Sequence, residues 1–307
     1  MEIRQNRFLT RFFLKHEWQL YLFILPTAIF FLVFHYVPLY GILIAFKRYN
    51  IARGIMESPW VGLFYFERFF RSNMFWELLR NTVVLSFYQL LVSFPFPLIL
   101  ALMINHSRRK GLNQFVQTVT YAPHFISLVV LSGMLYLFTS PSTGLVNYML
   151  NRIGHETINF MGKEEWFRHL FVFSHVWQHT GYQAIIFLAA LTAIDPAHYE
   201  AATLEGASKL QKIWYIDLPS IMPTVITLLL LQVGRMMNMD TQKALLMQTA
   251  TNLGTSEIIG TYVYKIGLID AQFSYSTAVN LFQTLINLVI LVAVNKVSRW
   301  LADESLW

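Results

Sequence analysis

Residues 18–46 read WQLYLFILPTAIFFLVFHYVPLYGILIAF and contain no Asp, Glu, Lys or Arg. About 17–25 apolar residues in a helix cross the ~30 Å hydrocarbon core of a bilayer. Lipid offers no hydrogen bond to the backbone, so a spanning segment must be a helix or part of a closed barrel. Apolar and polar residues do not alternate here with a period of two, so the segment predicts a transmembrane helix.

Further uncharged segments follow along the chain, and only 13% of its 307 residues are charged. That share is about half of what soluble domains carry, which excludes an ordinary soluble protein. Cysteine is absent, which excludes disulfides, thiolate metal sites and cysteine nucleophiles. We therefore predict an all-α membrane protein with about six transmembrane helices. The expected spans lie near residues 19–40, 82–104, 116–139, 169–194, 220–238 and 277–297.

The distribution of basic residues predicts which side of the membrane each loop occupies. The short connector 105–114 contains Arg108, Arg109 and Lys110 and is therefore expected on the cytoplasmic side. An even number of crossings then places both termini on that side as well, as segments 1–17 and 300–307. The basic segment 1–17 is expected to be either a short helix on the membrane surface or an extended tail, and not a cleaved signal peptide.

The first loop places six bases on the outer side, so the total numbers of bases on the two sides are nearly equal, which opposes this orientation. Its bases are interleaved with acidic and aromatic residues, so we predict a helix at the outer interface with snorkelling arginines. Residues 18–299 are treated as one membrane domain.

The cytoplasmic segment 195–219 differs from the other loops, and we call it the EAA loop after its Glu-Ala-Ala sequence. Asp195 is a good helix N-cap and is followed by proline at the first helical position. Gly206 permits a bend, and Pro219 ends the segment. The loop therefore predicts a helix, a bend and a second short helix at the membrane face, which by itself also fits an ordinary interfacial loop.

The EAA loop matches the pattern E-A-A-x3-G-x9-I-x-L-P and resembles the signature loop of permease subunits of binding-protein-dependent ABC importers. The matching residues are Glu200, Ala201, Ala202, Gly206, Ile216, Leu218 and Pro219. The resemblance implies that these residues form coupling helices that sit in a groove of the ATP-binding subunit. The segments PLYG (38–41), WVGL (60–63), FERFF (66–70), YAPHF (121–125) and DESLW (303–307) resemble oligosaccharide-type permeases of this family.

The family resemblance implies a multi-pass permease of the bacterial cytoplasmic membrane with the type I importer fold. It would import an oligosaccharide, with an anionic one such as alginate as a candidate. The chain contains no G-x-x-x-x-G-K-[S/T] loop, so ATP and Mg would bind to two partner ATPase subunits, and the chain itself would be no enzyme and hold no cofactor. The other implied partners are a second, homologous permease and an extracytoplasmic solute-binding protein; no nucleic acid is expected.

An ion-coupled secondary transporter is the alternative function. Such carriers use ionisable residues, usually carboxylates, near the middle of the membrane. The expected spans contain no Asp or Glu, which argues against it.

Arg235 is the one formal charge near a span interior. It is expected either to attract an anionic sugar or to snorkel or pair with Asp240.

His175 and His179 share a helix face but have no third ligand at a suitable spacing, so a metal site is not expected. We expect them instead to form a polar face towards a cavity or a subunit interface. The weaker candidates for the substrate pathway are Asn238, Asp240, Gln242, Lys243, His175, Gln178 and Gln183.

Overall fold

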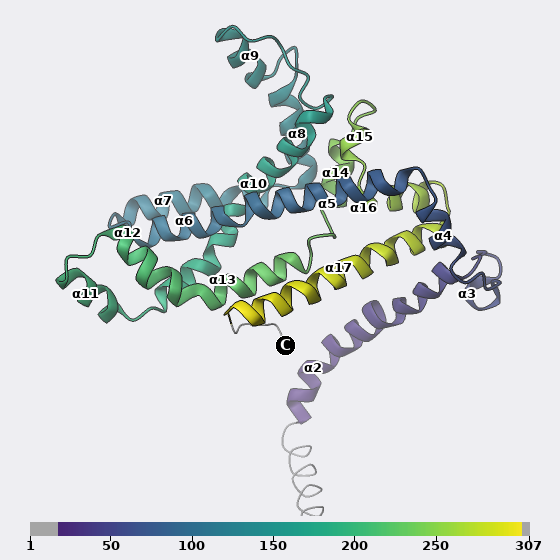
Figure 1. Ribbon diagram of the computed structural model, residues 1–307, viewed down its shortest axis with the longest axis horizontal. Coiled ribbons are helices and arrows are strands. Elements are labelled where there is room, and N and C mark those ends of the chain that lie inside the picture. Colours follow the sequence, from purple (N-terminus) through teal and green to yellow (C-terminus); the bar gives the residue numbers. More distant parts are fainter. Residues whose placement is uncertain (1–17, 303–307) are drawn as a thin grey trace, which may run out of the picture.

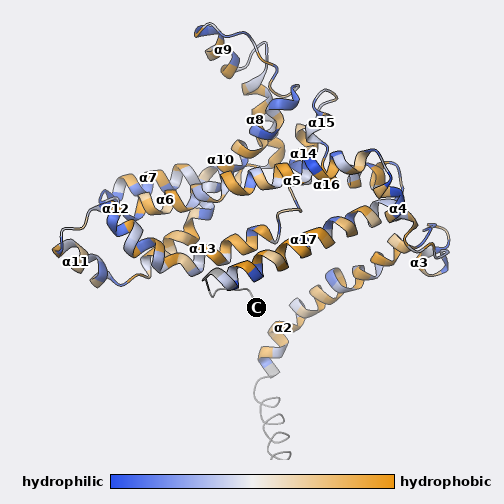
Figure 2. Cartoon of the chain, viewed as in Figure 1, coloured by the Kyte–Doolittle hydropathy of each residue, from blue (hydrophilic) through white to orange (hydrophobic). Residues whose placement is uncertain are grey.

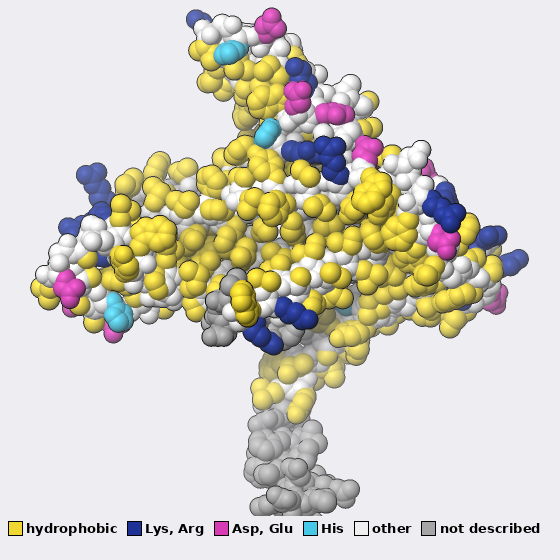
Figure 3. Space-filling view, viewed as in Figure 1, with side chains coloured by type: hydrophobic (Ala, Val, Ile, Leu, Met, Phe, Trp, Pro, Cys, Tyr) yellow, Lys and Arg dark blue, Asp and Glu magenta, His cyan; other side chains and the backbone are white. Residues whose placement is uncertain are grey.

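The computed structural model describes residues 18–302, and within that range the chain is almost entirely helical and forms no β-strand. Helices such as α5 (Met74–Ser93) and α17 (Phe273–Ala302) run roughly along the longest axis of the molecule, whereas α2 (Trp18–Phe31) runs obliquely below them (Figure 1). Their middle parts are mostly apolar (Figure 2). The visible surface shows a broad apolar region with Lys, Arg, Asp and Glu gathered mainly towards the ends (Figure 3). This distribution is the one expected of a protein surrounded by lipid.

Four helices of the described residues are long and apolar enough to cross a membrane: Gln19–Phe46, Met74–Asn105, Lys209–Val233 and Phe273–Trp300. The first comprises α2 (Trp18–Phe31), η1 (Leu32–Tyr36) and η2 (Val37–Phe46); the second comprises α5 (Met74–Ser93) and α6 (Pro95–Asn105). The third comprises α12 (Lys209–Lys212), η4 (Ile213–Asp217) and α13 (Leu218–Val233); the fourth is α17 (Phe273–Ala302). They contain the first, second and sixth predicted spans and most of the fifth.

The span predicted over 116–139 is not one straight helix. Residues Lys110–Phe125, which form α7 (Lys110–Tyr121) and η3 (Ala122–Phe125), meet α8 (Leu128–Thr139) at an angle of 102°. Ser127 caps α8 by accepting from the Val130 N–H, and the buried Gln178 donates to the carbonyl of Ile126 at 2.8 Å. These bonds satisfy part of the backbone at the bend. Counted as one span, the bent pair brings the apolar helices to five.

The fourth predicted span, 169–194, lies in α10 (Glu164–Thr192), which has 29 residues and is long enough to cross. Histidine and glutamine side chains make it less apolar than the other spans. Because α10 packs against α5, α6, α7, α13 and α14 (Thr241–Met247), much of its polar face meets protein instead of lipid. By helix length and apolar composition, four helices or five can cross a membrane, and the polar face of α10 keeps it out of that count. With α10 included, the number of spans agrees with the prediction of about six.

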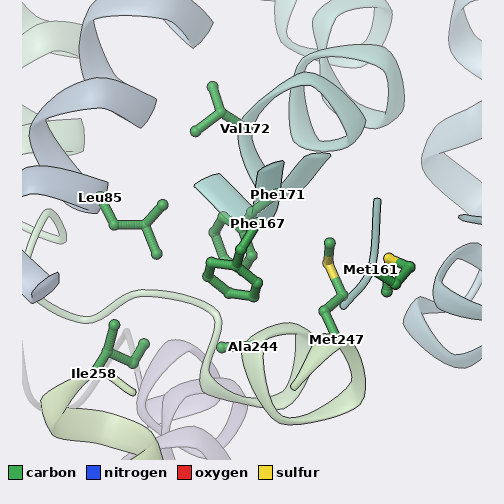
Figure 4. Close-up of a cluster of buried hydrophobic side chains, with 8 residues drawn as sticks. All are labelled: Leu85, Met161, Phe167, Phe171, Val172, Ala244, Met247 and Ile258. Carbon is green, nitrogen blue, oxygen red and sulfur yellow. The ribbon is translucent and has the colours of Figure 1, made fainter. Parts of the chain in front are cut away.

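A core cluster around α10 holds several distant segments together (Figure 4). Phe167, Phe171 and Val172 of α10 pack with Leu85 of α5 and with Met247 of α14 (Thr241–Met247). The cluster fixes the chain after α13 against the centre of the bundle. The remaining elements are α3 (Gly54–Glu57), α4 (Phe64–Phe70), α9 (Leu145–Arg152), α11 (Pro196–Leu204), α15 (Leu253–Ser256), α16 (Ile259–Tyr264) and η5 (Lys265–Ile269).

The first loop forms short helices whose aromatic side chains pack against protein. Phe66 contacts Ala278 of α17, and Phe69 of α4 is 1% exposed and packs in a cluster with Val279. Arg68 is exposed and lies over the ring of Tyr275, 4.4 Å from its centroid. The helix at the outer interface with snorkelling arginines stays a prediction, and the structure adds that α17 offers an aromatic and apolar surface to α4. The basic segment 1–17 and residues 303–307 lie outside the described residues.

Candidate functional site

The EAA loop lies at one end of the molecule, with α3 and α4 at the other (Figure 1). The Asp195 carboxylate accepts from the Ala197 N–H and begins α11, as predicted. Gly206 follows α11 with φ +79°, a left-handed conformation that favours glycine. Ser208 and Gln211 then form a capping box that begins α12. The loop thus has the predicted helix and bend. The prediction that Pro219 ends the second helix is wrong, because a π-helical turn at Ile213–Asp217 leads into α13 with Pro219 in its first turn, where a proline is tolerated, and the helix continues to Val233.

The EAA loop exposes apolar side chains at the end of the bundle. Leu204 is 89% exposed and Tyr215 is 80% exposed, and Leu210 and Trp214 are also mostly exposed. Of the signature residues, Glu200, Ala201, Gly206 and Pro219 are exposed, whereas Ala202, Ile216 and Leu218 are half-buried. Large apolar side chains left outside a core commonly mark a surface that contacts another protein.

A cluster of hydrogen bonds joins the EAA loop to the membrane helices, and we call it the Asp217 cluster. Asp217 is fully buried; its Oδ1 accepts from the Tyr199 hydroxyl at 2.5 Å, and its Oδ2 lies 2.5 Å from His106 Nε2. Burial and the bond to Asp217 raise the pKa of Tyr199 to about 12, so its hydroxyl stays protonated and can donate. These residues were not among those predicted from the sequence; an acid directly before Leu218-Pro219 in an apolar helix was the signal that could have found the cluster.

A polar cavity of about 520 Å³ lies between α5, α10, α13 and the segment that follows α13. Its polar wall is formed by Ser86, Gln89, Ser93, His175, Gln183, Gln232, Arg235, Asn238 and Asp240. Five of the eight predicted pathway residues are in this wall. The exposed Arg235 has no ion pair with Asp240 within the described residues, and Asp240 instead caps α14 through the Lys243 N–H.

The other three predicted pathway residues lie outside the wall of the polar cavity. Gln178 is buried and bonded to the carbonyl of Ile126. Lys243 is 1% exposed, and its Nζ donates to the carbonyl oxygen of Phe171 at 2.9 Å. Gln242 is exposed and does not line the cavity. A sequence pattern cannot separate these positions, because the turns after α13 decide which side chains face the cavity.

The span predicted over 220–238 ends early, at Val233, and the chain continues as a turn through residues 234–237. Amides of α17 satisfy this non-helical backbone. Gln283 donates to the carbonyl of Met237, and Asn287 donates to that of Gly234 while accepting from the Met237 N–H at 3.2 Å. Irregular backbone at membrane depth occurs where it is buried in protein or lines a cavity. A second cavity of about 480 Å³, against α16, η5 and α17, shares Asn238 and Met239 with the first.

Three histidines meet where α10 passes the bend between α7 and α8. The Nδ1 atoms of His124 and His179 lie 3.1 Å apart, and the ring of His175 is 4.4 Å from that of His179. The ring of His124 stacks on Tyr182 at 3.9 Å. Within residues 18–302 no three His, Cys, Asp or Glu side chains are arranged to hold a metal ion. The histidines contact one another and an aromatic ring, and His175 reaches the polar cavity.

The chain belongs to the family described as binding-protein-dependent transport system inner membrane component, whose pattern matches residues 93–303. It is therefore a multi-pass membrane component of a transport system. The polygalacturonan/rhamnogalacturonan transport system permease protein YteP of Bacillus subtilis is 42% identical, with 94% of this chain and 90% of that protein covered. Protein LplB of the same organism is 38% identical over 96% of this chain and 92% of its own length.

Solved structures show the same fold. A chain of a bacterial ABC transporter involved in the import of the acidic polysaccharide alginate aligns with a TM-score of 0.87 and 39% identity. The alignment covers 94% of this chain and 98% of that one. A chain of the bacterial alginate ABC transporter in complex with alginate pentasaccharide-bound periplasmic protein aligns with a TM-score of 0.88 and 38% identity. The all-α fold of a type I ABC importer permease, predicted from the sequence, is confirmed.

Proposed function

We propose that this chain forms part of the translocation pathway of an ATP-driven importer of anionic oligosaccharides. The observation that carries the proposal is the exposed EAA loop at one end of an apolar helical bundle that contains a polar cavity. Relatives named for polygalacturonan and alginate transport support an acidic sugar as substrate. A solute-binding protein on the extracytoplasmic side of a bacterial cytoplasmic membrane would deliver it.

The EAA loop is the proposed contact with one of the two ATP-binding subunits, which would hold ATP and Mg. Leu204 and Leu210 extend from the two sides of the Gly206 bend and are mostly exposed, so both can enter an apolar groove. Burying such side chains stabilises a complex by roughly 25 cal/mol per Å² of apolar area. Glu200 and Ala201 are exposed beside them and would lie at the rim of the contact.

The polar cavity is the proposed binding region for the sugar. Arg235 is exposed in its wall, and a guanidinium can bind a carboxylate with two parallel hydrogen bonds. Gln89, Gln183 and Asn238 supply amides that can donate to and accept from sugar hydroxyls. Since a single chain encloses only about 520 Å³, a second permease is proposed to complete the pathway.

Reconstitution with partner proteins from the native membrane tests the proposal. The purified complex should contain ATP-binding subunits and a second permease, and vesicles should take up alginate or polygalacturonan oligosaccharides only with ATP and the binding protein present. Uptake that needs no ATP and disappears when an ion gradient is dissipated would contradict the proposal and support an ion-coupled carrier.

A further inference from the structure

The helix α11 lies at the edge of the molecule and is joined to the rest of the chain at few points (Figure 1). The backbone leaves it through Gly206, which is exposed and has no atom within 4 Å of the position that a Cβ would occupy. Within the EAA loop, Lys212 donates to the Thr203 hydroxyl at 2.6 Å. The Asp217 cluster provides a different connection, because it reaches beyond the loop.

The Asp217 carboxylate joins three elements. One oxygen accepts from Tyr199 of α11, and the other contacts His106, the residue that caps the C-terminal end of α6. Asp217 itself immediately precedes α13. A carboxylate without exposed surface is stable only when its oxygens are bonded, so the three side chains are held in one arrangement.

The two membrane helices that meet at Asp217 both lead to the polar cavity. The helix α6 continues from α5 through Phe94, and α5 contributes Gln89 and Ser93 to the wall. The helix α13 contributes Gln232 and leads directly to Arg235. A displacement of α11 that is passed to both helices therefore moves two walls of the cavity at once.

We propose that Asp217, with His106 and Tyr199, is the positioning group of the coupling step, fixing α11 to α6 and α13 so that the three move as one body. This inference rests on the proposed docking of the EAA loop to ATP-binding subunits. Without the cluster, α11 could still dock, but its movement would reach α6 and α13 only along the chain, through α10 on one side and the bend at Gly206 on the other.

Matched substitutions test the proposal in the reconstituted complex. His106→Leu and Tyr199→Phe each remove one bond to Asp217, whereas His106→Gln keeps a donor at the position of Nε2. The control is Tyr88→Phe, which removes a tyrosine hydroxyl bonded to His169 Nδ1 at 2.8 Å, between α5 and α10. The readout is ATP hydrolysed per oligosaccharide imported, with whichever of alginate or polygalacturonan pentasaccharide the wild-type complex imports.

We expect the ratio of ATP hydrolysed to oligosaccharide imported to rise about fivefold or more in His106→Leu and Tyr199→Phe. This is the lower end of the effect that two coupled sites typically have on each other. His106→Gln and Tyr88→Phe should keep the wild-type ratio. The double variant His106→Leu/Asp217→Leu removes the buried charge together with its partner, so its complex should assemble in wild-type amounts while its ratio stays high.

A wild-type ratio in His106→Leu, or in the double variant, would overturn the positioning role and leave the cluster with a purely structural one. If the wild-type chain fails to bind ATP-binding subunits or to import either pentasaccharide, the proposed function fails instead. The two failures are therefore distinguishable.

Discussion

The side chain of Asn287 spans the turn that follows α13: its amide donates to the Gly234 carbonyl at 2.5 Å, and its oxygen accepts from the Met237 N–H. A helix that ends within a membrane leaves backbone groups without partners, and each costs free energy if lipid surrounds it. Asn287 and Gln283 supply those partners from α17. The turn that they stabilise carries Arg235 into the polar cavity.

Replacing Asn287 by leucine should destabilise the turn. The Gly234 carbonyl and the buried Met237 N–H would lose their partners, at a cost of about 1–3 kcal/mol each. The thermal unfolding temperature of the purified protein should fall, and uptake should fall with it. Thr284→Val on the same helix is the control, because Thr284 is exposed and bonds only to Asn280 of its own helix. Equal behaviour of the two variants would contradict this role.

Replacing Arg235 by methionine should weaken transport of an anionic oligosaccharide. A charge-assisted hydrogen bond contributes about 1–3 kcal/mol, and methionine keeps a comparable length without the charge. The apparent affinity for uptake should fall while the amount of assembled complex stays normal. Arg152→Met is the matched control, since Arg152 stacks on Tyr148 away from the cavity. Unchanged uptake of every anionic sugar that the wild type transports would assign Arg235 to packing.

The orientation of the chain can be tested with single cysteines, because the sequence has none. Arg108, Arg109 and Lys110 lie in the short connector between the second and third spans, which places this connector in the cytoplasm. Because an even number of crossings separates it from both termini and from the EAA loop, we predict that these also lie in the cytoplasm. In intact cells an impermeant thiol reagent should label a cysteine at Ser142, between α8 and α9, but not one at Ser107 or Ser208. Labelling of Ser107 or Ser208 from outside would reverse the orientation.

The class of fold was predictable from the sequence because lipid imposes a simple rule on composition. Residues 18–46 and 271–295 carry no formal charge, and the structure has long helices in both places. The bend of the third span was harder to predict, because one of the bonds that satisfy its backbone comes from Gln178, which lies more than fifty residues further along the chain. The polar residues of α10 likewise follow from its central position, which only packing reveals.

The candidate sites were predictable to different extents. The EAA loop is local, and the cap at Asp195 and the bend at Gly206 follow from neighbouring residues. The Asp217 cluster joins residues separated by 111 positions, so no local pattern contains it. Lys243 is polar in sequence yet lies buried against Phe171, because the turn after α13 points it away from the cavity.

We propose that the EAA loop transmits ATP hydrolysis to the membrane helices, and the variant Gly206→Asp is the sharpest test of this coupling. Gly206 and Gly154 have similar φ values, +79° and +84°, and at both the position that a Cβ would occupy has no atom within 4 Å. Gly154→Asp therefore imposes the same backbone cost away from the loop. Only at Gly206 should the new carboxylate enter the groove of the ATP-binding subunit. Burying a carboxylate there without a hydrogen-bonding group or a counter-charge costs several kcal/mol.

The decisive measurement is ATP hydrolysis stimulated by the binding protein, together with uptake, in the reconstituted complex. We predict that Gly206→Asp reaches the membrane in normal amounts but loses stimulated hydrolysis and uptake together, while Gly154→Asp behaves like the wild type. Normal uptake in Gly206→Asp would contradict the coupling role of the EAA loop.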